Sequence, residues 1–201
     1  MNSQLMGLLE LKQGANNLPY EIPMHPNLVH FTLGLFIIAI IFDIAGAIFP
    51  LERPILKFLA LPALRSGFFE VGWYNLVASA AITFFTVAWG FFEAMLAKLP
   101  ANVEIDWGFG AKATLLLYGL GGILLLAAIV AMAVWRGLQR YRWRRNSPRQ
   151  VQWSYLLVGI VILGIMYVQG TLGAQLGDEF GIHVTAANLL ENSKNPNVQL
   201  K

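Results

Sequence analysis

The chain has 201 residues, of which 57% are hydrophobic and only 12% are charged, and its mean hydropathy is +0.58. Soluble domains carry about 25% charged residues, so this composition excludes an ordinary soluble domain and indicates a membrane protein. Cysteine is absent, which excludes disulfides and thiolate metal sites, and the net charge of +3 comes largely from arginines placed between apolar stretches, which argues against a nucleic-acid-binding surface.

Four apolar stretches are long enough to cross a bilayer as helices. They cover about residues 28–49, 71–97, 113–135 and 153–176. We therefore predict an all-α integral membrane four-helix bundle over residues 28–176, with an N-terminal tail (1–27) and a polar C-terminal tail (177–201). Pro26 fits the first turn of the first helix, where its missing N–H costs nothing. His25 is interpreted as a boundary residue before it.

The distribution of lysine and arginine predicts the orientation of the bundle. Nine of the fourteen lie in the loops 51–69 and 136–150, and both of these loops fall on the same side of a four-span protein. Cytoplasmic loops are enriched in positive charge, so the basic loops are predicted to be inside and both termini outside. A bacterial inner (plasma) membrane and a thylakoid membrane both fit this pattern.

The second span carries one charged residue, Glu93. At about 100° per residue, Glu93 shares one helix face with other polar side chains of that span. This face forms a polar stripe made of Asn75, Ser79, Thr86 and Glu93. Such a stripe is expected to face the bundle interior, where it either hydrogen-bonds to neighbouring helices or lines a path for protons or small ions.

A group of polar residues is expected near the outer ends of the spans, and this layer is the predicted cofactor-binding site. Its candidates are His30, Glu93, Lys112, His183 and His25. Histidines on facing helices can hold a b-type haem, but His25 and His30 are about 140° apart around a helix and cannot both face one iron. His183 would have to supply the second ligand. The spacing matches no zinc motif, so no metal site is predicted.

Two further features concern packing. Asp43, the one charged residue of the first span, is predicted to be a buried polar residue that meets Asn75. The fourth span carries a stripe of small residues that allows helices to approach closely, within the bundle or between subunits. This stripe consists of Gly159, Gly170, Gly173 and Gly177.

Several motifs resemble a bacterial family of four-span membrane proteins, the domain of unknown function 2231. The most specific is the run from His25 to Leu35, which reads His-Pro-x-x-x-His-Phe-x-x-Gly-Leu and is followed eight residues later by Asp43. Gly90-x-x-Glu93 and the Gly-Thr-Leu-Gly run at 170–173 are similar to later parts of the family pattern, and the resemblance covers about residues 24–185. It implies the four-span fold, and an architecture similar to two-haem membrane cytochromes.

The chain departs from that family where members often carry histidines. Lys112 lies at the start of the third span where a histidine is common, and Glu179-Phe180 precede the late glycine, with His183 shifted downstream. These departures weaken a haem assignment, and the family implies no agreed activity.

The leading functional prediction is a non-catalytic membrane protein that acts as an accessory, assembly or structural component. Besides contacting the lipid bilayer, the chain would then assemble into a homo-oligomer or a larger membrane complex. Two alternatives stay open: a haem- or quinone-binding electron-transfer component, and a proton or small-ion pathway along Asn75–Glu93. No Ser/His/Asp arrangement or phosphate loop indicates catalysis.

Overall fold

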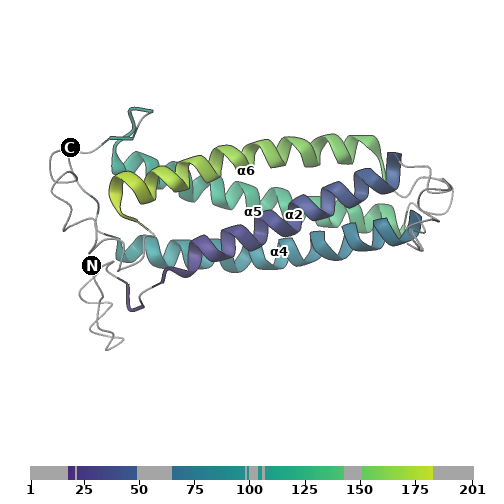
Figure 1. The fold of residues 1–201 in the computed structure, drawn as a ribbon, viewed down its shortest axis with the longest axis horizontal. Coiled ribbons are helices and arrows are strands. Elements are labelled where there is room, and N and C mark those ends of the chain that lie inside the picture. Colours follow the sequence, from purple (N-terminus) through teal and green to yellow (C-terminus); the bar gives the residue numbers. More distant parts are fainter. Residues whose placement is uncertain are drawn as a thin grey trace, which may run out of the picture. The chain divides into compact units, whose positions relative to one another are not determined.

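The computed structural model describes residues 18–20, 22–48, 65–97, 99, 104–105, 107–142 and 151–182. Within these ranges the chain forms four long helices (Figure 1), which confirms the predicted all-α class. They are α2 (Met24–Ile48), α4 (Arg65–Leu96), α5 (Ala111–Tyr141) and α6 (Trp153–Phe180). Each is long and apolar enough to cross a membrane.

The helices extend beyond the predicted spans because a helix does not stop where its hydropathy falls. One such extension is in α5, which continues through Arg136 to Tyr141, where a basic loop is predicted to begin. Leucine, glutamine and arginine are good helix formers, and a single glycine, Gly137, costs only about 1 kcal/mol within a helix, so the backbone hydrogen bonds continue through Arg136–Tyr141. The fourth helix likewise passes Gly177 and ends before Gly181, whose φ of 62° allows the Ile182 amide to reach the Leu176 carbonyl.

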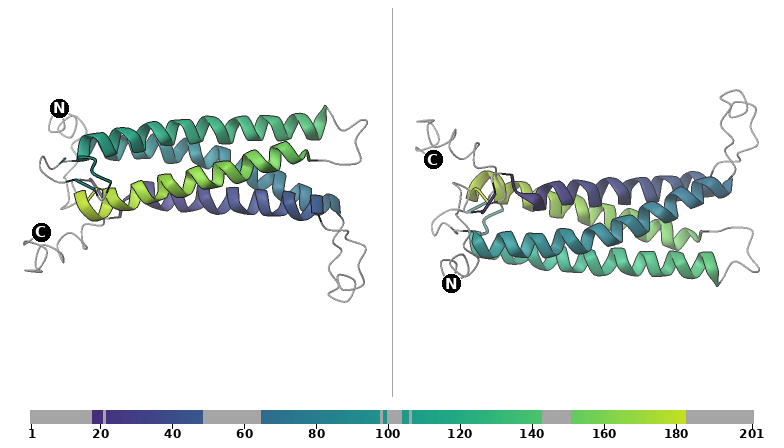
Figure 2. Two further views of the ribbon diagram at one scale, coloured as in Figure 1. Left: turned by 90° about the horizontal axis from the view of Figure 1, so that it is seen from above. Right: turned by 90° about the horizontal axis from the view of Figure 1, so that it is seen from below.

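The described part of the chain divides into two compact units, and each of the four helices contributes a segment to both. The first unit contains residues up to Val29, Phe85–Ile123 and residues from Val168 onward. The second contains His30–Phe84 and Leu124–Tyr167. Within each unit, segments of consecutive helices lie alongside one another and run in opposite directions (Figures 1 and 2).

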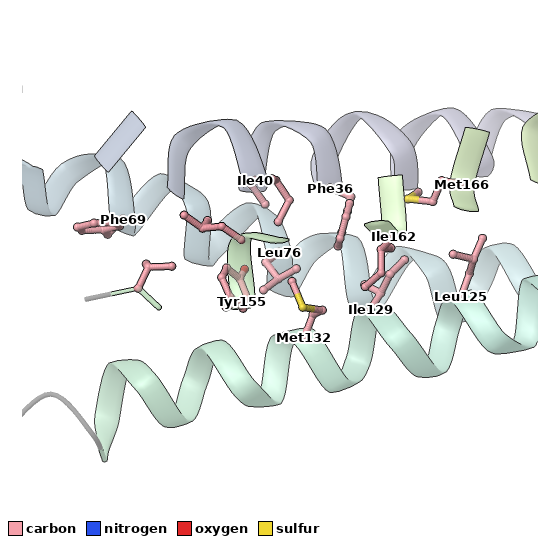
Figure 3. Close-up of a cluster of buried hydrophobic side chains, with 13 residues drawn as sticks. Phe36, Ile40, Phe69, Leu76, Leu125, Ile129, Met132, Tyr155, Ile162 and Met166 are labelled. Carbon is pink, nitrogen blue, oxygen red and sulfur yellow. The ribbon is translucent and has the colours of Figure 1, made fainter. Parts of the chain in front are cut away.

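The core of the second unit is built from large apolar side chains of all four helices (Figure 3). Phe36 and Ile40 of α2 lie among Leu76 of α4, Ile129 of α5 and residues of α6 such as Tyr155. Lipid is as apolar as these side chains, so close packing rather than exclusion from water holds membrane helices together.

Gly159 illustrates how close this packing is. A Cβ atom at this position would lie 2.5 Å from Cδ1 of Ile40 and 3.4 Å from Cε of Met132. The absence of a side chain on α6 therefore lets Ile40 of α2 fill the space, as expected for a small residue at a helix contact.

The first unit has two smaller apolar clusters. One joins Ile105 and Ala111 to the end of α6 through Leu172, Leu176 and Phe180. The other joins Leu18 to Leu96 of α4, with Tyr20 and Phe92 packed against them. The second cluster holds the residues that precede α2 against the last turns of α4.

Candidate functional site

Glu93 is the centre of a buried polar site in the first unit. Its side chain is 1% exposed. Oε1 accepts hydrogen bonds from the hydroxyl of Tyr20 (2.9 Å) and from the backbone amides of Met24 (2.8 Å) and His25 (3.2 Å). These amides belong to the first turn of α2, where N–H groups have no acceptor within their own helix and the helix dipole favours a negative charge. Glu93 of α4 thus caps the start of α2.

His25 is the buried histidine of this site. Its Nδ1 lies 2.9 Å from the Thr86 carbonyl oxygen on α4, and its Nε2 lies 2.9 Å from the Tyr118 hydroxyl on α5. A carbonyl oxygen can only accept, so Nδ1 carries a proton; in the neutral ring Nε2 then accepts from Tyr118. One imidazole therefore connects three helices.

A glycine on α4 makes room for that imidazole. A Cβ at Gly90 would lie 2.7 Å from both Nδ1 and Cε1 of His25, which is closer than packed atoms approach. Because Thr86, Gly90 and Glu93 lie three or four residues apart, they share one face of α4. The hydrogen bonds to the His25 ring and the absence of a side chain at Gly90 together position His25 against α4.

Tyr20 extends the site into the segment before α2. It donates to Glu93 and accepts a hydrogen bond from Nε1 of Trp89 at 3.0 Å. Burial raises the pKa of the Tyr20 phenol above its usual value, and the nearby Glu93 carboxylate raises it further. Tyr20 is thus a proton donor at physiological pH and fixes its segment to α4.

The structure brings two of the predicted site residues, His25 and Glu93, into contact. His25 is the second residue of α2 and is buried, whereas His30 and Lys112 are exposed. His183 lies outside the described residues. The histidine in hydrogen-bond contact with Glu93, through its backbone amide, is therefore His25. Helical geometry separates the two histidines as expected; the point that the sequence did not reveal is that α2 begins before His25.

The described histidines do not fit a pair of axial haem ligands. His25 is buried with a partner at each ring nitrogen, and His30, five residues further along the same helix, is exposed. Two axial ligands have to face one iron from opposite sides, which these side chains do not.

Members of the polar stripe on α4 differ in their contacts. Ser79, Thr86 and Glu93 are buried, and Asn75 is partly buried. The Ser79 hydroxyl donates to the Thr32 carbonyl of α2 at 3.1 Å, whereas Asn75 Nδ2 donates to a carbonyl one turn back in its own helix, at 2.9 Å. Ser79 therefore joins two helices, and the Asn75 amide bonds within one.

Asp43 forms a second buried polar site, in the second unit. Its Oδ2 and Oδ1 accept hydrogen bonds from Nε and Nη2 of Arg136, both at 3.0 Å, and both side chains are 0% exposed. Nη2 also donates to the Phe69 carbonyl at 3.3 Å. Asp43 is buried, and its bidentate partner is Arg136 of α5 in place of the predicted Asn75.

A glycine again permits the close approach. A Cβ at Gly72 would lie 2.5 Å from Oδ1 of Asp43. The phenol of Tyr155 on α6 also adjoins this carboxylate. Asp43 of α2 is therefore enclosed by residues of α4, α5 and α6, and its negative charge is balanced by the positive charge of Arg136.

The sequence contained a signal for Arg136. Leu125, Ile129 and Met132 precede it at spacings of four and three residues, and all four are buried. This is the spacing of one helix face, so Arg136 continues the buried face of α5. The four arginines that follow Arg140 and the polar residues between them make Arg136 resemble the start of a basic loop, which hides this spacing.

Arg140, one turn further along α5, forms a second, less buried ion pair. Its Nη2 lies 2.6 Å from Oε2 of Glu70 on α4, and its guanidinium lies 5.9 Å from the ring centroid of Trp73. The two side chains are 12% and 39% exposed, so solvent screens this ion pair more than it screens Asp43–Arg136, whose side chains are fully buried.

The predicted glycine stripe of α6 has mixed surroundings. Gly159 contacts Ile40, as described above, and a Cβ at Gly173 would lie 3.0 Å from the Tyr118 ring. Gly170 has nothing within 4 Å of its Cβ position, and Gly177 is partly buried. Two of the four glycines thus receive side chains of neighbouring helices within their own unit.

The sequence was compared with known protein families, curated proteins and solved structures. Residues 21–186 match the family described as "Predicted membrane protein (DUF2231)". The match covers most of the chain and includes all four helices, with Asp43, Glu93 and His25, and it confirms the predicted resemblance. Comparisons with curated proteins and with solved structures gave no match. The chain therefore belongs to this family of predicted membrane proteins and is an integral membrane protein with four apolar helices.

Proposed function

We propose that this protein is a non-catalytic component of its membrane, with an accessory, assembly or structural role. One observation carries this proposal: the buried ionisable side chains of both polar sites bond to neighbouring helices. Asp43 joins α2 to α5, Glu93 joins α4 to the start of α2, and His25 joins α2 to α4 and α5.

The energetic cost of these groups supports the same interpretation. A charged side chain in a span costs about 2.5–3.5 kcal/mol on insertion scales, so each needs a compensating role. In this protein the compensation is a set of contacts between helices, which fixes how the helices pack. A fixed bundle with apolar outer faces is what a structural or assembly component requires.

The proposed partner is a second copy of the chain or a larger complex in the same membrane. The exposed surface of α6 supports this, because Gly170 is exposed and has nothing within 4 Å of its Cβ position. Small residues on an outer helix face allow another helix to approach closely. We propose a bacterial inner membrane or a thylakoid membrane as the location.

A spectrum of the purified protein tests the accessory role against cofactor binding. The protein would be extracted in mild detergent, and a dithionite-reduced minus oxidised spectrum recorded. We expect no Soret or α-band. A band corresponding to about one haem per chain, lost in His25→Ala or in His30→Ala, would overturn the proposal and identify the ligand.

The proposed orientation, with both termini outside and the basic loops cytoplasmic, can be tested with single cysteines because the chain has none. Glu104→Cys and Asn146→Cys would be labelled in intact cells with a membrane-impermeant maleimide. Glu104→Cys should react in intact cells, and Asn146→Cys only after the membrane is opened. The reverse pattern would refute the orientation.

A proton pathway is the second candidate, because Ser79, Thr86 and Glu93 are buried on α4 and Glu93 lies beside the hydrogen-bonded pair His25–Tyr118. In proteoliposomes, Glu93→Gln should abolish proton flux if this candidate is correct. Glu104→Gln is the matched control, since Glu104 is exposed and lies outside the helices. Equal flux in wild type and Glu93→Gln would dismiss the pathway.

A further inference from the structure

The connection between α4 and α5 presents two large aromatic side chains outside the helices. Trp107 is 46% exposed and Phe109 is 41% exposed, and they flank Gly108. Gly108 has a φ of 77°, in the left-handed region that a side chain disfavours. The glycine thus allows a tight turn with an exposed aromatic residue on each side, and we call Ile105 together with Trp107–Phe109 the aromatic turn.

The aromatic turn is held in place by the protein. The Ile105 amide donates to the Phe109 carbonyl at 3.0 Å, and the Gly108 amide donates to the Ile105 carbonyl at 2.8 Å. Ile105 is buried in the cluster formed with the end of α6. The Thr114 hydroxyl donates to the carbonyls of Phe109 (3.4 Å) and Gly110 (3.1 Å) and so ties the turn to the first turn of α5. Trp107 and Phe109 are therefore exposed on a fixed support.

The turn is continuous with a membrane-crossing helix. Phe109 lies two residues before Ala111, the first residue of α5. The 31 residues of α5 extend about 46 Å at 1.5 Å per residue, whereas the hydrocarbon core of a bilayer is about 30 Å thick. The ends of α5 therefore reach the headgroup region. Lys112, in its first turn, is exposed.

We propose that the aromatic turn inserts into the interface of the bilayer that holds the helices, with Lys112 in contact with phospholipid phosphate. An indole ring fits this region because its body is apolar and its N–H can donate to lipid ester carbonyls. The Phe109 ring has no polar group and lies on the acyl-chain side. An ammonium at the start of the helix finds its acceptor in the phosphates. This surface is independent of the accessory role proposed above.

Fluorescence quenching tests the aromatic turn. Wild type and Trp107→Phe would be reconstituted in phosphatidylcholine–phosphatidylglycerol vesicles that carry a doxyl group near the headgroup or near the acyl-chain end. The emission lost in Trp107→Phe should be quenched by the shallow doxyl lipid and spared by aqueous iodide. Iodide quenching of that emission without doxyl quenching would place Trp107 in water or against a protein and would overturn the proposal. Far-UV circular dichroism confirms that the variant folds.

A second pair of variants tests Lys112. Lys112→Glu places a negative charge at the phosphates and should reduce shallow quenching of Trp107, most strongly in vesicles rich in phosphatidylglycerol. Lys112→Arg keeps the positive charge and should retain wild-type quenching. If Lys112→Glu behaves as wild type at every lipid composition, the lysine contact is refuted.

Discussion

Replacement of Arg136 by methionine is the sharpest test of how this bundle is held together. The change removes the guanidinium but keeps an unbranched apolar side chain of similar length. It would leave Asp43 at 0% exposure without the two hydrogen bonds of 3.0 Å that now match its charge, and the Phe69 carbonyl without its 3.3 Å donor.

The expected loss follows from this geometry. Hydrogen bonds to charged groups contribute about 1.5–3 kcal/mol each, and removing one partner of a buried ion pair costs about 3–5 kcal/mol. We therefore expect Arg136→Met to lower the free energy of unfolding by about 3–5 kcal/mol. Asp43→Asn combined with Arg136→Met removes both charges and should recover part of this loss, because no unpaired charge is then buried.

Unfolding can be followed by circular dichroism in mixed micelles of dodecyl maltoside with increasing dodecyl sulfate. Arg142→Met is the matched control, because Arg142 is exposed directly after the end of α5 and its replacement should change stability by less than about 0.5 kcal/mol. Equal stability of Arg136→Met and Arg142→Met, or a double variant no more stable than Arg136→Met, would refute the argument that the buried pair matters through its charge balance.

Three further predictions use the same assay. Gly90→Ala should destabilise the protein by about 1–3 kcal/mol because its Cβ would lie 2.7 Å from the His25 ring. Gly34→Ala, whose Cβ would have nothing within 4 Å, should stabilise the protein by about 0.5–1 kcal/mol. Equal effects of the two substitutions would contradict the close packing of His25 against Gly90. Glu93→Leu should cost about 3 kcal/mol or more by leaving three donors without their acceptor, and Glu93→Gln less, since it keeps a carbonyl oxygen; the opposite order would argue against the helix cap. The pKa of Tyr20 is higher in the folded protein than in the unfolded chain, so the contribution of Tyr20 to stability is complete below about pH 10 and declines above that pH. In a titration of the unfolding midpoint against pH, Tyr20→Phe should therefore lose stability less steeply at alkaline pH than wild type. An equally steep loss in both proteins would contradict this prediction.

The fold was predictable because the constraint on a membrane span is local. A stretch of about 20 apolar residues has to satisfy its backbone hydrogen bonds internally, which only a helix does within a single segment. The four stretches therefore gave the number and order of the helices. Their ends were less predictable, as α5 shows by continuing through Arg136, because a helix can extend into polar sequence for as long as its backbone bonds are made.

The buried sites were only partly predictable, because the sequence shows which residues are charged within a span but does not show which distant residue each of them contacts. Asp43 and Glu93 are recognisable as buried because a charge in a span requires compensation. Arg136 resembled one more residue of a basic loop, although its spacing from Met132 continues the buried face of α5.

The sequence by itself determined that four helices cross a bilayer and that Asp43 and Glu93 need polar partners, because both conclusions follow from the cost of exposing polar groups to lipid. Tertiary structure alone decided the partners. Arg136 meets Asp43 across 93 positions of the chain, and the first turn of α2 meets Glu93 across 68 or 69. Such pairings depend on the rotation and offset of packed helices, which side chains such as Ile40 against Gly159 set in three dimensions.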